Sequence, residues 1–569
     1  MTKYAIRGGG QVNLTQANFI AAGGEGQVFA HGDEAFKIYL KPERMIPEAK
    51  IAELAGIADD RVIRPQRVLL DGRGHPVGYS MRRVPDAHPL CQLFTQAFKA
   101  RAGVDGATVL RLVQDMQRSV GAVHAAQVLI VDANEFNFLA ARDLSEVYFI
   151  DVDSYQTPNF PATALMDGVK DWSARGLWTQ GSDWFSWGVV TFQLFVGIHP
   201  YKGKHPSVRG LAERMQANLS VFHADVSVPR MVPPFDVIPG AYLSWYRAVF
   251  ADGYRGAPPA DAQISTAPST ARPVASATQV TLTSIRSFGN DILEYATCGG
   301  EEAAILDGPH GRVAWVLDGG RNREVPVAPG GHLSWTGGGV PLYAWIDRGD
   351  VHVRDMRKGG EEMALTLRGR SLATAGGRVY VHSGESVVEL QFFTAGVRII
   401  GAPRVVANVV PLSTQIYHGV ALQSVLGAWY ANLLGDPGRS VQVRLTDLDG
   451  SRVVDAWADG SVLLVIAERG GRMDRYTYEV GRAASLRWVD RDVGHGDLNA
   501  VVLPRGVVAQ IDEGGDLLLF PAHGAQQGRR ISDPALAGLR LTQGGGDVLC
   551  WRGNQVFRLS TRPTTGEKK

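Results

Sequence analysis

The C-terminal half of the chain repeats a strand–turn–strand pattern, and this repeat restricts the fold more than any other feature. Seven units begin near Glu302, Gly339, Gly376, Tyr417, Asp459, Arg505 and Gly546. Successive units begin 37, 37, 41, 42, 46 and 41 residues apart. Periods of about 40–50 residues with several strands per unit are typical of propeller blades. A β-sandwich pair or a β-helix is the alternative, but a sandwich does not need near-constant spacing. We therefore predict a β-propeller of about seven blades over residues 278–569.

The chain before this repeat has a different texture. Apolar residues recur at helical spacing, and the clearest series is Val109, Val113, Met116, Val120 and Val123. Residues 257–277 are rich in Ala, Pro, Ser and Thr and show no hydrophobic periodicity, which is typical of a linker. A chain of 569 residues exceeds one compact core. We expect an α+β domain over residues 1–256, a linker over 257–277 and an all-β domain after it.

Bulk properties exclude several classes of partner. The formal charge of +1 gives no electrostatic reason to expect nucleic acid or an anionic membrane. Cys91, Cys298 and Cys550 have neither metal-type nor disulfide-framework spacing, which fits a reducing cytoplasm. The most apolar stretch, residues 187–198, is too short to span a bilayer, and the N-terminus has no apolar signal core. We expect a soluble, cytoplasmic protein.

A glycine-rich turn lies near the start of the first domain. Gly23 and Gly26 precede Val28, and glycines let backbone N–H groups approach phosphates without Cβ clashes. By itself the pattern favours a simple hairpin turn. Lys37 follows on an apolar strand, where an ammonium could contact phosphates or remain on the surface.

A lysine in that role needs a carboxylate to hold it. The next predicted helix offers Glu48 and Glu53. We favour Glu48, because Ile51 and Leu54 then pack on the same helix face.

Three polar residues follow short apolar segments in the middle of the domain. Asp132 comes after an apolar strand, and Asn137 lies five residues later. Asp151 directly follows a second expected strand, residues 147–150. A positioned carboxylate can accept the proton of an attacking hydroxyl, and an amide oxygen can bind Mg²⁺ without adding charge. Any one of them alone could be an ordinary turn residue.

The joint order of these residues resembles the protein kinase superfamily over about residues 15–256. The resemblance implies a bilobal fold, with an N-lobe over about 1–84 and a C-lobe over about 85–256. It implies ATP with Mg²⁺ or Mn²⁺ as cofactors. Lys37 and Glu48 would be the phosphate-binding pair, Asp132 and Lys37 the catalytic residues, and Asn137 and Asp151 the metal ligands. Gly23, Gly26, Val28 and Met81 would line the nucleotide.

Two later segments add to this resemblance. Residues 182–189 are similar to the buried helix of the kinase C-lobe, in which an aspartate, here Asp183, anchors the catalytic loop. Residues 245–255 are similar to the end of the kinase domain, where an arginine packs under the activation segment. The departures are Val131 in place of an arginine, Asn134 in place of a lysine, and Asp153 in place of the DFG glycine. They imply no gating by activation-loop phosphorylation and a slower rate.

The segments 149–156, 182–186 and 197–201 resemble a bacterial subgroup, the kinase of the tellurium-resistance-associated phosphorylation triad. That resemblance implies a von Willebrand A-domain protein and a protein phosphatase 2C homologue as partners.

The sequence thus predicts a protein serine/threonine kinase whose propeller binds a substrate or regulatory protein. One alternative is a pseudokinase scaffold that binds nucleotide without efficient turnover. Another is a small-molecule kinase of the aminoglycoside type, which the Asp183 helix argues against.

Overall fold

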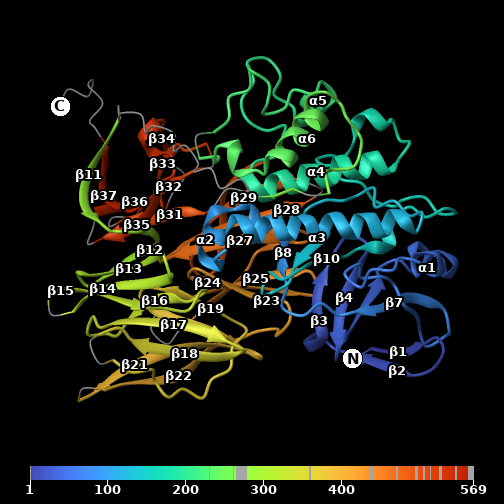
Figure 1. The fold of residues 1–569 in the computed structure, drawn as a ribbon. Helices are drawn as coiled ribbons and strands as arrows, with labels where there is room; N and C mark the ends of the chain where they lie inside the picture. The colour runs from blue at the N-terminus through green and yellow to red at the C-terminus, as the bar shows by residue number, and fades with distance from the viewer. Residues whose placement is uncertain are drawn as a thin grey trace.

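The computed structural model describes most of the chain and divides it into two regions of different texture (Figure 1). The described residues are 2–561, except 230, 261, 264–278, 319, 358–359, 397, 436–439, 470–471, 494–497, 504–505, 513, 524–527 and 545–546. Most of the predicted linker therefore lies outside the described residues. Its first part packs on the preceding domain, because Gln114 Nε2 donates to the carbonyl of Ala262 at 3.0 Å.

A seven-stranded antiparallel sheet begins the chain, in the order β2-β1-β6-β7-β5-β4-β3. Its strands are β1 (Thr2–Ile6), β2 (Gln11–Leu14), β3 (Phe19–Ala22), β4 (Gly26–His31), β5 (Glu34–Tyr39), β6 (Arg67–Leu70) and β7 (Pro76–Arg82). Phe19, Phe29, Phe36 and Leu69 form the apolar core on one face of this sheet. Alternating side chains thus leave the other face free to present Lys37 toward the rest of the first half.

Helices follow the sheet, and all six α-helices that the structure describes lie before residue 251. They are α1 (Glu48–Leu54), α2 (Gln96–Ala102), α3 (Gly106–Ala125), α4 (Gln180–Val196), α5 (Leu211–Gln216) and α6 (Gly240–Phe250). The predicted apolar face of α3 is confirmed, since Val113, Met116 and Val120 are fully buried. A 3₁₀ helix, η3 (Leu90–Phe94), precedes α2. A small antiparallel sheet of β8 (His88–Pro89), β9 (Phe138–Ala140) and β10 (Val147–Phe149) lies beside these helices.

In the second half, the described residues form seven antiparallel sheets. Six of them are made of strands adjacent in sequence: β12–β15, β16–β18, β19–β22, β23–β26, β27–β30 and β31–β34. The seventh pairs β35, β36 and β37 with β11 from the start of the region. The strand bounds are β11 (Val280–Ser287), β12 (Asp291–Cys298), β13 (Glu301–Gly308), β14 (Gly311–Asp318), β15 (Arg321–Pro326), β16 (His332–Trp335), β17 (Pro341–Asp347), β18 (Asp350–Asp355), β19 (Ser371–Ala375), β20 (Arg378–Ser383), β21 (Ser386–Ala395), β22 (Arg398–Asn408), β23 (Thr414–Tyr417), β24 (Val420–Val425), β25 (Ala428–Leu433), β26 (Val441–Arg444), β27 (Arg452–Asp459), β28 (Val462–Arg469), β29 (Arg472–Val480), β30 (Ala484–Asp490), β31 (Asn499–Leu503), β32 (Val507–Ile511), β33 (Leu517–Pro521), β34 (Arg529–Ile531), β35 (Arg540–Gly544), β36 (Asp547–Arg552) and β37 (Gln555–Thr561).

Each repeat unit found in the sequence corresponds to one hairpin inside one sheet. The unit near Glu302 is β13–β14, and the unit near Asp459 is β28–β29. In every sheet the unit covers the second and third strands, while the first strand escaped detection. The chain is therefore mostly β, with a mixed first half and an antiparallel second half.

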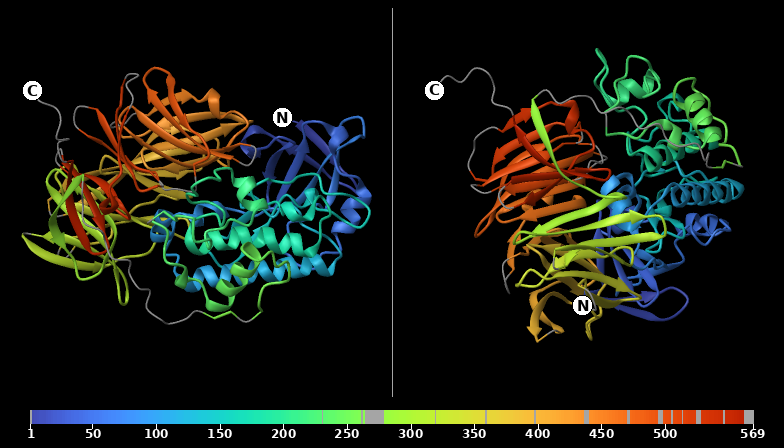
Figure 2. Two further views of the ribbon diagram at one scale, coloured as in Figure 1. Left: turned by 90° about the horizontal axis from the view of Figure 1, so that it is seen from above. Right: turned by 60° about the vertical axis from the view of Figure 1, so that its left-hand side comes forward.

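The two halves pack directly against each other. Figure 2 shows the sheets of the second half gathered on one side of the molecule and the helices of the first half on the other. Val454, Ile466 and Met473, from β27–β29, belong to the same apolar cluster as the buried residues of α3 and α4. Among the described residues, no helix combines the length and apolar character needed to cross a membrane.

Candidate functional site

Lys37 lies at the centre of a buried ionic network. It sits on β5, opposite Val28 on β4 and Tyr79 on β7, and is 6% exposed. Its Nζ lies 2.9 Å from Asp151 Oδ1 and 2.7 Å from Asp153 Oδ2. Burial alone would lower the pKa of Lys37, but the negative charge of Asp153, together with Tyr79 and Asp151, raises it well above the usual value. The lysine is therefore held as a cation.

The expected partner of Lys37 is corrected by this geometry. Glu48 does not bind the lysine; it pairs with Arg7 at 3.2 Å, and its side chain is 47% exposed. Glu48 is the first residue of α1, whereas the buried face of that helix carries Lys50, Ile51 and Leu54. Glu48 lies outside that buried face, and Lys50 is the charged residue that points inward.

Asp153 supplies the carboxylate instead. It is 2% exposed and also accepts a hydrogen bond from Tyr39 Oη at 2.5 Å. Lys50 Nζ donates to the backbone carbonyl of Asp153 at 2.8 Å, which helps to hold the backbone of Asp153 in place. Burial would raise the pKa of Asp153, but Lys37 and the hydrogen bonds to it lower the pKa overall. The sequence does show an acidic residue two positions after Asp151. There it was interpreted only as an aspartate in place of the DFG glycine, and not as the partner of Lys37.

The loop at residues 130–137 is anchored from beneath by Asp183 of α4. This fully buried carboxylate accepts the backbone N–H groups of Ile130 and Val131, each at 2.8 Å. Its Oδ2 also lies 2.9 Å from His124 Nε2 at the end of α3. Val131 has a φ of 64°, a conformation that is unfavourable for a β-branched residue. The Asp183 carboxylate binds the N–H of this residue and that of the residue before it, which holds the backbone here.

Asp132 and Asn137 lie together at the end of this loop. Asn137 Nδ2 donates to the Asp132 carbonyl at 3.0 Å and approaches Asp132 Oδ2 at 3.4 Å. Asp132 Oδ1 accepts the backbone N–H of Met166 at 2.8 Å, so the segment after Asp151 covers the carboxylate. Burial raises the pKa of Asp132 above its usual value.

Asn134 braces the loop from within. It is buried, and its Oδ1 accepts the backbone N–H of Phe136 at 2.9 Å. No cation therefore stands at this position to reach a phosphate.

Further along, the segment that covers Asp132 is tied to the end of the domain. Arg255 Nε and Nη2 donate to the two oxygens of Asp171, at 2.7 and 3.0 Å. The predicted arginine contact beneath this segment is confirmed.

The glycine turn faces the same region. A Cβ on Gly26 would lie 2.6 Å from the Ile38 carbonyl oxygen, so this position requires glycine for close strand packing. A Cβ on Gly23 would meet nothing within 4 Å, so the space beside this residue is open, while its own N–H donates to the Gly26 carbonyl at 2.9 Å. Glu25, between them, reaches to 3.6 Å of Lys37 Nζ.

One cavity of about 1720 Å³ collects most of the predicted site. Its lining includes Gly23, Gly26, Val28, Lys37, Met81, Asn137 and Asp151. Glu48, Asp132 and Asp183 do not line it. The cavity exceeds the roughly 300–1,000 Å³ of an ordinary small-molecule site.

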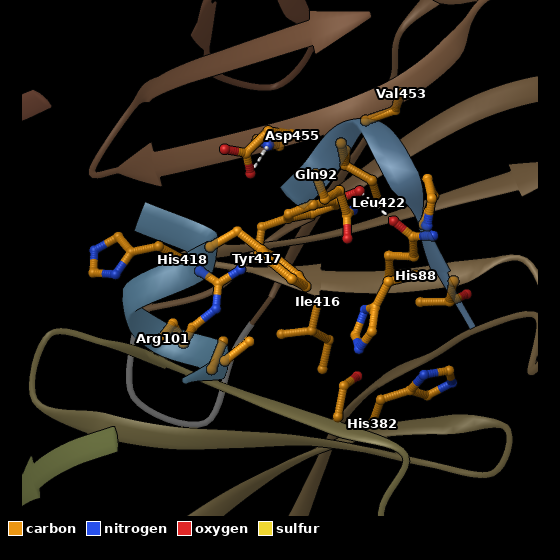
Figure 3. A pocket seen from close by; sticks show the side chains of 18 of the residues that line it. His88, Gln92, Arg101, His382, Ile416, Tyr417, His418, Leu422, Val453 and Asp455 are labelled. Atoms are coloured by element: carbon orange, nitrogen blue, oxygen red, sulfur yellow. Dashed lines mark hydrogen bonds between the residues drawn. The ribbon is translucent and has the colours of Figure 1, made fainter. Parts of the chain in front are cut away.

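The lining of this cavity extends onto the second half. Tyr417, His418 and Asp455 line it from β23, its following turn and β27, opposite Gln92 and Arg101 of η3 and α2 (Figure 3). The sequence did not predict that both halves line this cavity, because a local pattern does not indicate which strands face the other half.

The donor set fits a hydrated divalent cation and a phosphate group. Asn137 and Asp151 offer an amide and a carboxylate oxygen, and the Ile150 N–H donates to the Asn137 carbonyl at 2.9 Å, which brings the two segments together. Asp153 Oδ1 is buried and has no hydrogen-bond partner among the described residues.

A second group of possible metal ligands lies elsewhere. His205, His223 and Asp225 converge, but the Nδ1 atoms of both imidazoles accept backbone N–H groups, from Val208 and Asp225 respectively. Nδ1 of each ring is therefore already engaged by the backbone.

Comparison with known proteins adds no relative. No family model matches the chain, and no curated protein matches its sequence.

Proposed function

We propose that this protein is an ATP- and Mg²⁺-dependent protein serine/threonine kinase acting in the cytoplasm. The observation that carries the proposal is the gathering of Lys37, Asn137 and Asp151 on one cavity, with Asp132 beside Asn137. Phosphoryl transfer needs this set: a cation for phosphates, oxygen ligands for the metal, and a carboxylate for the hydroxyl.

Each residue takes a role that its surroundings support. The glycine turn that contains Gly23 and the cation of Lys37 would hold the phosphates, and Asp153 would keep Lys37 in place. Asn137 and Asp151 would hold Mg²⁺, which neutralises charge on the phosphates. The raised pKa of Asp132 suits a group that takes a proton from a serine or threonine hydroxyl.

We further propose a kinase-like bilobal architecture for residues 1–256. The seven-stranded sheet with α1 would be the N-lobe, and α2–α6 would form the C-lobe. The seven sheets, with β11 closing the last of them, support a seven-bladed propeller. This propeller would bind a substrate or regulatory protein.

Transfer of label from ATP to candidate proteins tests the proposal in the presence of Mg²⁺ or Mn²⁺. Asp132→Ala should lose about 10²–10⁴-fold in rate, as expected when a general base is removed. Asp151→Ala should lose the thermal stabilisation that Mg-ATP gives the wild type. Asp60→Ala is the control, because the Asp60 side chain is 98% exposed. Equal transfer by the Asp132 variant and the wild type would rule out its role.

A pseudokinase scaffold is the second candidate, and two contacts favour it. Asn134 is used for bracing the loop, and the Met166 N–H already occupies Asp132. This candidate predicts stabilisation by Mg-ATP with no label transfer to any protein, and measurable turnover by the purified wild type excludes it.

The partners in the proposal are a von Willebrand A-domain protein and a protein phosphatase 2C homologue, as in the tellurium-resistance-associated triad. Genes for both beside the gene for this chain would support that placement. Labelling of the A-domain protein, reversed by the phosphatase, is the direct test.

A further inference from the structure

An arginine of the second half reaches the loop that carries Asp132 and Asn137. Arg452, the first residue of β27, donates from Nη1 to the backbone carbonyl of Phe136 at 3.0 Å. Its Cζ lies 5.2 Å from the centroid of the Phe136 ring, within cation–π distance. Phe136 is 3% exposed and immediately precedes Asn137.

Both backbone polar groups of Phe136 are therefore hydrogen-bonded. Its N–H is taken by Asn134 Oδ1, and its carbonyl by Arg452. The other end of the loop is held by Asp183 through Ile130 and Val131. Residues 130–137 thus have one anchor within the first half and one supplied by the second.

The strand that carries Arg452 is itself fixed to the first half. Gln92 Nε2 of η3 donates to the Val454 carbonyl at 3.3 Å. Val454 is buried in the apolar cluster shared with α3 and α4. The backbone of Arg452 is already fixed by this packing, so its side chain loses little additional freedom when it forms the hydrogen bond. Such a bond can hold the Phe136 carbonyl at a defined position.

We infer that Arg452 is a positioning residue for phosphoryl transfer, which makes the second half a part of the catalytic unit and not only a docking platform. The inference rests on the proposed kinase function. Arg452 acts through Phe136: the bond to its carbonyl fixes Asn137 and, through the Asn137 side chain, the orientation of Asp132. It predicts that loss of Arg452 slows turnover more than it weakens nucleotide binding.

Arg312 provides a matched control. It is another arginine of the second half that donates to a first-half carbonyl, that of Arg101, at 2.7 Å. That carbonyl lies near the end of α2, and the hydrogen bonds of Arg312 among the described residues go to Ala100 and Arg101, although Arg312 also lines the cavity. Arg312→Ala therefore removes hydrogen bonds between the halves that do not involve residues 130–137.

The experiment uses the full chain, since the two halves share one apolar cluster. Arg452→Ala, Arg452→Lys and Arg312→Ala are compared by kcat, by KM for ATP and by hydrogen exchange at the amides of residues 134–138. Arg452→Ala should lower kcat about tenfold, with KM within about twofold, because misplaced catalytic groups cost rate more than binding. Exchange at the Phe136 and Asn137 amides should rise. Arg452→Lys, which keeps one donor, should recover part of both effects.

The outcomes separate the inference from the proposed function. Faster exchange in Arg452→Ala alone, in a protein whose wild type transfers no phosphate, keeps the loop anchor and removes the kinase role. Equal kcat and equal exchange in the Arg452 and Arg312 alanine variants overturn the positioning role even in an active kinase.

Discussion

The two halves of the molecule fix their side chains in different ways. In the first half, single polar contacts join residues far apart in sequence, such as Lys37 with Asp153 and Asp183 with Ile130. In the second half, six of the seven sheets are built from neighbouring strands around apolar residues. The comparison teaches that one polar substitution should disable the first half, whereas an apolar truncation in the second should weaken one sheet and spare the site.

The most damaging change tests the polar side of this comparison. Asp183→Ala leaves two buried backbone N–H groups and His124 without their acceptor, so the free energy of unfolding should fall by about 3–5 kcal/mol. Urea denaturation of the purified chain measures this. Asp183→Asn keeps one acceptor oxygen and should lose less. A loss below about 1 kcal/mol for the alanine variant would contradict the anchoring role.

The next change tests the apolar side. Leu342→Ala, in β17, truncates a fully buried side chain in a cluster of the second half and should cost about 2–4 kcal/mol. Thermal stabilisation by Mg-ATP should remain as in the wild type, because this cluster contains no residue of the first half. If nucleotide stabilisation disappears with Leu342, the two halves are coupled more broadly than the comparison allows.

A smaller effect distinguishes the two candidate partners of Lys37. Asp153→Ala removes the carboxylate 2.7 Å from Lys37 and should weaken Mg-ATP binding about tenfold, as expected for loss of a charged hydrogen bond. Glu48→Ala should leave the affinity within about twofold, since Glu48 contacts only Arg7 among the ion pairs of the described residues. Isothermal titration with a non-hydrolysable ATP analogue measures both. The reverse ranking would restore Glu48 as the functional partner.

The smallest effect concerns the charge on Asp132. Because its pKa is raised, the folded protein holds this proton to higher pH than the unfolded chain does, so stability falls as pH rises from the ordinary carboxyl value through the raised one. Asp132→Asn removes that titration. The variant should melt about 1–3 °C above the wild type at neutral pH, and the difference should shrink near about pH 4. A melting difference independent of pH would show that burial of this charge costs nothing.

The parts predicted from sequence are those that depend on near neighbours. The hairpins of the second half follow from alternating residues and glycine turns, and α3 follows from its apolar spacing from Val109 to Val123. The order Lys37, Asp132, Asn137, Asp151 was enough to place four polar residues, and the structure brings them into one region.

The rest depended on long-range contacts that local patterns do not encode. Helix periodicity placed Glu48 on the face of Ile51 and Leu54. In the structure Lys50 points inward instead, because it binds the backbone of Asp153, about a hundred residues away. The first strand of each sheet was missed, because short strands such as β16 and β23 lack a clear alternation. Arg452 could not be singled out at all, since its partner is a backbone carbonyl of the other half.

The pairing of β11 with β37 has a consequence for the making of the protein. During translation β11 emerges first among the strands of its region, and its partner emerges last. Until residues 555–561 leave the ribosome, β11 remains an unpaired edge able to join strands of neighbouring nascent chains. A premature stop before β37 would therefore release a chain with an open edge on both β11 and β36, and chaperones would have to guard it. The sheet that contains β11 can therefore form only after β37 has been made.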